Sequence, residues 1–255
     1  MHVVTATNVE AFAHSLRPLL GLQANHAFCS AVRGDASFAH ALSQWTMILG
    51  MPIDHGRTPE EAEAARGVVL QRFEGVFRQH APAQDLAAFG RDAAPLLDQA
   101  VDRFLARWRS EPPADTWYGC FRYGVERQAG LVSLHFYNAV MPDSPFADSD
   151  ALVDDLRQCL RAVVREAPGT ERVQCGSWVN NLPPIQAILP RTYIESLTPT
   201  DPDAKTGLGW WGQFVTNEGN LNAERAEHLL STGEFRYPRL LGRCSLAEAL
   251  AHLDC

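Results

Sequence analysis

His135 has the residue type and the position expected of a general base. It lies in the run LVSLHFYNAV, Leu131–Val140, whose alternation predicts a strand. On a strand, His135 shares one face with Ser133 and Tyr137. An imidazole titrates near neutral pH, and a rigid strand fixes its direction, so this face is a candidate catalytic surface. The alternative is a histidine that a neighbour in the sheet satisfies.

A second polar cluster follows the next predicted strand, in the run VQCGSWVNN. Strand ends beside a crossover connection commonly carry ligand-contacting groups, so we expect substrate contacts here. The candidates are Cys175, Ser177, Trp178, Asn180 and Asn181. The alternatives are a buried structural thiol at Cys175 and turn-forming roles for the two asparagines.

Two further residues are candidates for the same site. Tyr193 could donate a proton, although a packing role is its alternative. Trp210 and Trp211 are adjacent in the predicted strand GWWGQFV and would face opposite sides, so only one, Trp211, is assigned to the site. The aspartates between 143 and 155 lack the spacing of a calcium loop, and no metal site is predicted.

The composition excludes several classes of protein. The chain has 255 residues and a net charge of -8, and neither half carries the basic stripe of a nucleic-acid-binding protein. Of its 22 basic residues only Lys205 is lysine, and it lies in the Pro/Asp-rich run TPTDPDAKTGLG, expected to be a linker. A phosphate-binding loop or a pyridoxal site would need a lysine in another setting.

The expected location is the cytoplasm. The six cysteines form no C-x-x-C pair, and no secretion signal is recognisable in the sequence. No apolar run approaches the roughly 18 residues of a membrane span, so no membrane partner is expected. The oligomeric state cannot be read from these features.

The spacing of apolar residues predicts a helical first half. Thr58, Pro59 and Glu61 form a capping-box pattern that opens a helix reaching about Phe77. Another helix is predicted over 92–109 and ends at Pro112-Pro113, and shorter helices are predicted over 8–20 and 36–49. This half is expected to form a helical domain, residues 1–113.

After Pro113 the period changes from 3.6 to 2, which predicts a second, α+β domain over 114–255. A hairpin over about 117–140, a helix over 151–166 and the strand RVQCGSW predict a βαβ crossover in a mixed sheet. Later elements are a short helix within 182–197, the strand Gly209–Val215, a helix over 222–230, a short extended piece EFRY and a helix capped by Ser245 and Glu248.

Several short motifs follow one another in a set order: Leu134-His135, Cys175-Gly-Ser-Trp178, Leu189-Pro190, Pro238-Arg239, Ser245-Leu246 and His252-Leu253. With the order of elements, they resemble the two-domain acyltransferases that have a helical amino-terminal domain and a GNAT-like carboxy-terminal domain. The resemblance covers most of residues 115–255. It implies transfer of an acyl group from a coenzyme A-type thioester to a small amine or similar acceptor, with His135 as base and Tyr193 as acid.

The sequence departs from this family at one loop. GNAT enzymes bind pyrophosphate on a Gly-rich loop, whereas MPDSPFADSD contains no glycine and places Asp143, Asp148 and Asp150 where phosphates would lie. Two alternatives follow: a non-catalytic module of the same fold that binds a small ligand or partner, and a hydrolase that uses Cys175 with His135. The two enzyme hypotheses and the ligand-pocket hypothesis require that 131–140 and 171–178 are neighbouring strands with an open cleft between their ends.

Overall fold

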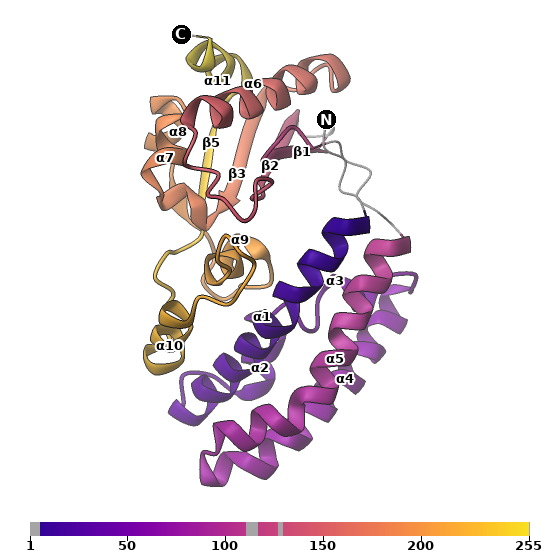
Figure 1. Ribbon diagram of the computed structural model, residues 1–255. Helices are drawn as coiled ribbons and strands as arrows, with labels where there is room; N and C mark the ends of the chain where they lie inside the picture. Colours follow the sequence, from indigo (N-terminus) through magenta and orange to yellow (C-terminus); the bar gives the residue numbers. More distant parts are fainter. Residues whose placement is uncertain (1–5, 111–116, 127–129, 255) are drawn as a thin grey trace.

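The computed structural model describes residues 6–110, 117–126 and 130–254, and their fold is mixed α+β (Figure 1). A helical first half is followed by a five-stranded mixed sheet with helices, which confirms the predicted class at this level. The helices of the first half are α1 (Ala6–Arg33), α2 (Phe38–Gln44), α3 (Met51–Asp54), α4 (Pro59–His80) and α5 (Leu86–Ser110), with a 3-10 turn, η1 (Ala81–Ala83).

The start of α4 confirms the predicted capping box. The Thr58 hydroxyl accepts the N–H of Glu61, and the Glu61 carboxylate accepts the N–H of Thr58, so two amide groups of the first turn are satisfied. The apolar faces of α1, α4 and α5 then meet in a core that includes Phe28, Phe73 and Phe89, all buried.

The sheet has the order β1-β2-β3-β5-β4. The predicted hairpin is confirmed as β1 (Phe121–Glu126) and β2 (Leu131–Phe136), and the predicted crossover as β2, α6 (Ser149–Glu166) and β3 (Arg172–Ser177), with β2 and β3 parallel. Strand β5 (Leu240–Ser245) is antiparallel to β3 and to the short β4 (Thr198–Pro199). Helix α11 (Leu246–Leu253) begins at the predicted capping box of Ser245 and Glu248.

Helices cover one face of this sheet. The inward side chains of β2 and β3, such as Val132, Leu134 and Val173, pack with Leu156 and Leu160 of α6 in a second core. Helix α11 and the short helices α7 (Pro183–Ala187) and α8 (Arg191–Glu195) contribute to the same core, beyond the 3-10 turn η3 (Trp178–Asn181). The other face carries the polar alternate residues, as the period of two requires.

The prediction of a strand over Gly209–Val215 is wrong. This segment forms α9 (Leu208–Trp211) and a 3-10 turn, η4 (Gly212–Phe214). A strand would send Trp210 and Trp211 to opposite sides, whereas a helical turn lets both be buried, at 5% and 0% exposure. The last strand of the sheet is instead β5, which the sequence did not predict. The run EFRY, predicted to be extended, forms no strand.

The segment after β4 returns to the helical half. Trp211, Phe214 and Leu229 of α9, η4 and α10 (Ala223–Thr232) belong to the first core, and α9 and α10 lie beside α1 and α2 in Figure 1. Residues of the predicted second domain therefore form part of the core of the helical half. The predicted division at residues 113 and 114 lies outside the described residues and stays a prediction.

Lys205 is anchored, although it was expected to lie in a free linker. Its N–H donates to the carbonyl of Gln44 over 2.8 Å, and its own carbonyl accepts from Trp211 Nε1 over 2.7 Å. Its ammonium lies 4.2 Å from the centre of the Trp45 ring, a cation–π contact between the two halves. Within the described residues, no helix is both long and apolar enough to cross a bilayer.

Candidate functional site

The candidate site is the place where the two parallel strands separate. Strands β2 and β3 are paired from Leu131 and Arg172 to Ser133 and Gln174, and the pairing ends there. Both strands continue, because β2 stays paired with β1 up to Phe136 and β3 stays paired with β5 up to Ser177. The strands predicted to be neighbours are therefore neighbours, and an opening begins between their carboxyl ends.

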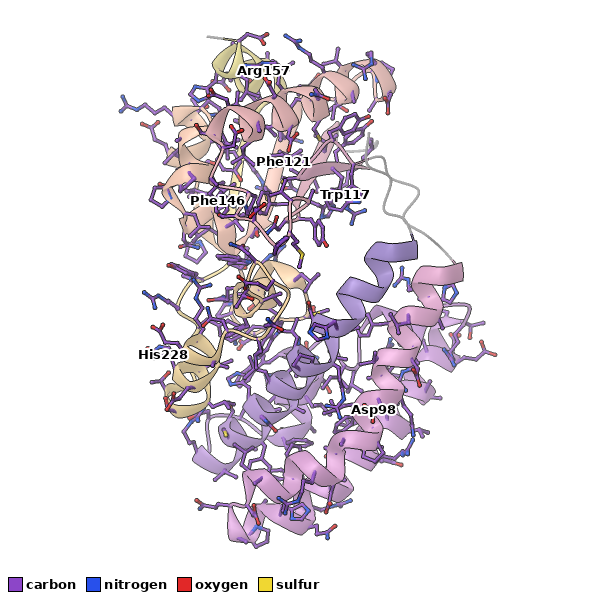
Figure 2. The ribbon with its side chains drawn as sticks, viewed as in Figure 1. Asp98, Trp117, Phe121, Phe146, Arg157 and His228 are labelled. Atoms are coloured by element: carbon purple, nitrogen blue, oxygen red, sulfur yellow. The ribbon has the colours of Figure 1, made fainter. Side chains whose placement is uncertain are left out.

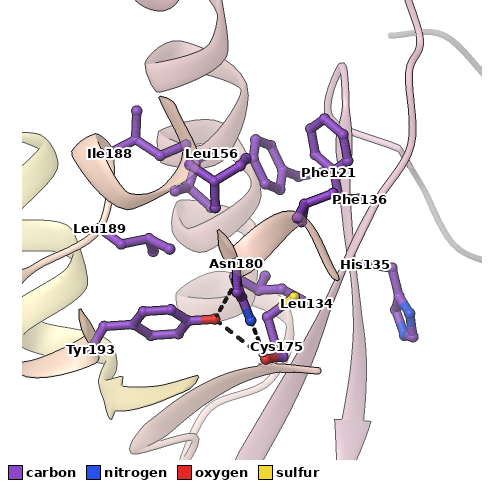
Figure 3. Close-up of a pocket in the computed structure, with 12 residues that line it drawn as sticks. Phe121, Leu134, His135, Phe136, Leu156, Cys175, Asn180, Ile188, Leu189 and Tyr193 are labelled. Carbon is purple, nitrogen blue, oxygen red and sulfur yellow. Dashed lines mark hydrogen bonds between the residues drawn. The ribbon is translucent and has the colours of Figure 1, made fainter. Parts of the chain in front are cut away.

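Packed side chains fill most of this opening. An apolar cavity of about 20 Å³ remains between β2, β3, α6 and the α7–α8 region (Figure 3). Its lining includes Leu134, Cys175, Asn180 and Tyr193. This volume corresponds to about one water molecule, so the open cleft that the enzyme and ligand-pocket hypotheses require is not present in this structure. A ligand that enters the gap must displace side chains.

Asn180 connects the strands at the edge of the gap. It is 1% exposed, and its Nδ2 donates to the carbonyl oxygens of Cys175, over 2.9 Å, and Leu240, over 2.8 Å. The hydroxyl of Tyr193 lies 3.1 Å from Asn180 Oδ1 and 3.4 Å from the Cys175 carbonyl oxygen. Cys175, Asn180 and Tyr193, each predicted for the site, are thus brought together around one strand end.

The ring of Tyr193 lies directly on strand β5. A Cβ atom at Gly242 would collide with the ring, so glycine is required for this approach. Tyr193 is 1% exposed, and burial raises its phenol pKa. The hydroxyl therefore keeps its proton at neutral pH.

Cys175 has the properties of a structural thiol. Its side chain points to the covered face of the sheet, and burial raises its pKa to about 11. His135 lies on the other side of β2, as Figure 3 shows. The thiol–imidazole pairing that the hydrolase hypothesis requires is not formed.

His135 belongs to the polar face of the sheet, where its side chain is exposed. Three side chains on this face are linked by hydrogen bonds, beginning at Ser133, the next residue of β2 on the same face as His135. Gln174 Nε2 donates to the Ser133 hydroxyl oxygen over 2.9 Å, and Arg243 Nε donates to Gln174 Oε1 over 3.2 Å. Ser133 also donates to Glu126 over 3.0 Å. The predicted face of His135 and Ser133 is therefore present and largely polar.

Aromatic rings adjoin His135 at the carboxyl end of β2. The ring of Tyr137 lies 5.7 Å from that of Trp117, and the guanidinium of Arg122 lies 5.3 Å from the Trp117 ring. Arg122 is paired directly with His135 across the hairpin. The indole Nε1 of Trp117 is buried and has no hydrogen-bond partner among the described residues.

Four predicted contact residues lie elsewhere. Ser177 accepts the N–H of Val179 over 3.4 Å, and Asn181 Nδ2 donates to the carbonyls of Trp178 and Pro238. The Trp178 ring stacks on Tyr237 at 5.9 Å. Trp211 is buried in the first core. The structure therefore does not bring it to the strand gap.

Sequence reasoning did not select Trp117, Arg122 or Arg239. The guanidinium of Arg239 lies on Gly176, and its Nε donates to the Gly176 carbonyl over 3.0 Å. Hairpin register could have identified Arg122 as the partner of His135. Arg239 carried no such signal, because it reaches Gly176 only through the unpredicted strand β5.

The loop before α6 does not fit a pyrophosphate. Its Asp148 carboxylate accepts the N–H of Ala151 over 3.0 Å and so occupies an amide that a phosphate would need. Asp143 and Asp150 are exposed in the same region. Among the residues that the structure describes, no group of three or more His, Cys, Asp or Glu side chains could hold a metal ion.

In comparisons with known proteins, no family model matches this chain, and no match was found among curated proteins or solved structures.

Proposed function

We propose that the sheet half is an acyltransferase domain of GNAT-like fold that moves an acyl group from a coenzyme A-type thioester to a small amine. One observation carries the proposal. The parallel pair β2–β3 separates after Ser133 and Gln174, and His135 stands on the open face at that point. The order of strands and the crossover helix α6 agree with the resemblance that the motifs suggest.

The proposed donor enters the gap as an extended arm. The pantetheine arm of such thioesters contains two amide groups, and an extended amide chain can hydrogen-bond to unpaired strand edges as an added strand does. Strand edges beyond Ser133 and Gln174 provide this setting. Because Asp148 caps α6, recognition is assigned to the arm rather than to the phosphates.

The proposed reaction is direct attack by the amine. The amine nitrogen bonds to the thioester carbonyl carbon, the carbon–sulfur bond breaks, and His135 takes the proton that the nitrogen loses. Tyr193 gives its proton to the leaving thiolate and later regains one from solvent. Burial raises the phenol pKa, so the proton is present at neutral pH but is given up less readily than from an exposed tyrosine.

A binding module without catalysis is the second candidate. Two observations favour it: the hydroxyl of Tyr193 is engaged with Asn180 in a buried position, and the loop before α6 lacks an amide cradle for phosphate. In this case the gap or the open face would hold a ligand that the protein does not transform.

The test combines ligand binding and turnover. Acetyl-coenzyme A at 100 times its dissociation constant should stabilise the protein by about 2.7 kcal/mol in thermal unfolding. With a panel of amines, His135→Ala should reduce acetyl transfer by about 100-fold or more. His228→Ala is the matched control, since His228 is exposed on α10, away from the sheet (Figure 2), and should leave the rate unchanged.

The outcomes separate the two candidates. Stabilisation by acetyl-coenzyme A without transfer to any amine would support the binding module. Absence of stabilisation at millimolar acetyl-coenzyme A, together with absence of transfer, would overturn the acyltransferase proposal. A loss below tenfold in His135→Ala would remove the base role from this residue.

A further inference from the structure

Two arginines lie on the same face of the sheet as His135. Arg122 is directly opposite it on β1, and cross-strand neighbours are about 5 Å apart. On β3, Gly176 lies two residues beyond Gln174, the last residue of that strand that pairs with β2, and on the same face as Gln174. The Arg239 guanidinium lies on Gly176, so it borders the gap from the side of β3.

The packing around each arginine sets its direction. The Arg122 guanidinium lies against the Trp117 ring, and this contact holds it at the edge of the face. Arg239 is held through its Nε by the Gly176 carbonyl, and its stem meets α9, because a Cβ at Gly209 would lie 2.9 Å from Arg239 Nε. Glycine at 176 provides the space in which this guanidinium lies.

The charges of this face have the opposite sign to those of the whole chain. The net charge of the chain is -8, yet the described open face of the strands carries Arg122, Arg172 and Arg243 against Glu126, with Arg239 beside them. Glu126 lies four residues from Arg122 along β1 and accepts from Ser133. Beside Arg122, the buried Trp117 indole N–H has no acceptor within the part of the chain that the structure describes.

We propose that Arg122 and Arg239 form an anion-binding site around His135, and that the acceptor amine carries a carboxylate or a phosphate. This inference rests on the proposed function, because it names the acceptor class of the same site. Guanidinium groups bind both anions through charge-assisted hydrogen bonds, and an anion held on this face would bring the amine of the same molecule toward His135.

The test measures binding without an acyl donor, by calorimetry at low salt. β-Alanine is compared with β-alaninamide, and phosphoethanolamine with ethanolamine, so that the two pairs distinguish carboxylate from phosphate. We expect the anionic member of at least one pair to bind tenfold or more tightly. Its affinity should fall as salt is added, whereas that of the neutral-ended member should not.

Variants then assign the site. Arg122→Gln and Arg239→Gln should each weaken binding of the preferred anion about tenfold or more, and Arg122→Lys should retain most of it. Arg172→Gln is the matched control, because Arg172 lies on the same face at the other end of β3, and it should change the affinity less than twofold.

Three results would overturn the inference: equal, salt-independent binding of both members in each pair, a loss in Arg172→Gln as large as in Arg239→Gln, or no loss in either Arg122→Gln or Arg239→Gln. None of these depends on acetyl-coenzyme A. Failure of the donor to bind would therefore remove the proposed function alone, while equal binding of the amines would remove only the acceptor class.

Discussion

At the scale of single residues, Asn180 decides how the strand end is completed. Beyond the stretch of β3 that pairs with β2, the carbonyl of Cys175 accepts from the Asn180 amide. The same amide reaches Leu240 on β5. Its sequence context predicted a turn former or a ligand contact, and its side chain instead connects two strands.

Asn180→Ala should lower the free energy of unfolding by about 2–4 kcal/mol, because two buried carbonyl groups each lose a donor. Asn181→Ala is the matched control. Its amide also donates to two carbonyls, but the residue is only half-buried, so water can replace it and the loss should be about 1 kcal/mol. Denaturant unfolding of both variants measures the difference, and equal losses would contradict the role given to Asn180.

At the scale of elements, β5 positions the aromatic acid candidate. The strand runs antiparallel to β3 and has glycine at 242, which lets the Tyr193 ring lie on its backbone. Without that contact the hydroxyl would not reach Asn180. Strand β5 therefore positions the Tyr193 ring, which belongs to the second core and lines the cavity in the gap.

Gly242→Ala should destabilise the protein by about 1–3 kcal/mol, because the new Cβ meets a rigid ring in a packed core. The comparison is Gly67→Ala in α4, where no atom lies within 4 Å of the new Cβ. This second change should leave stability unaltered or raise it by up to about 1 kcal/mol, since alanine favours helix. Thermal unfolding of the pair is the measurement, and a Gly242→Ala variant as stable as the parent would rule out the contact.

At the scale of the whole molecule, aromatic residues from both halves surround a buried histidine. His26 of α1 is 1% exposed, and its ring centre lies 5.8 Å from those of Trp45 and Phe235 and 5.9 Å from that of Trp211. Burial, and to a smaller extent the charges of Lys205 and Arg33, lowers its pKa to about 4. The folded protein therefore holds this imidazole neutral.

This burial predicts a dependence of stability on pH. The unfolded chain binds a proton at His26 near pH 6.5, whereas the folded chain resists it until about pH 4. Protonation therefore favours unfolding, and stability should fall by roughly 3 kcal/mol as the pH drops through this window, with no contribution above it.

His26→Phe keeps an aromatic ring and should remove this part of the acid sensitivity, measured as the change in unfolding free energy between pH 7 and pH 4. His228→Phe, at an exposed position on α10, should keep it. The same pH slope in all three proteins would show that His26 does not carry the effect.

Features that depend on neighbours in the chain were predictable. Both capping boxes, the hairpin, α6 and β3 follow from residues a few positions apart, because capping and periodicity are local. The shared face of His135 and Ser133 also followed from the period of two. The prediction that Trp211 lies on a strand at the site was wrong because its contacts are not local. Its partners Trp45 and Phe235 are distant in sequence, and packing against them outweighs the local strand pattern.

The amino-acid sequence by itself determined a helical first half, a mixed sheet with one crossover, and a histidine on the polar face of that sheet, since local periodicity and end-capping specify these. Only the tertiary structure decided where β2 and β3 part, that α9 and α10 complete the helical core, and that the Arg239 guanidinium lies on Gly176. Those features arise from contacts between segments far apart in the chain, whose energies depend on how the two cores pack.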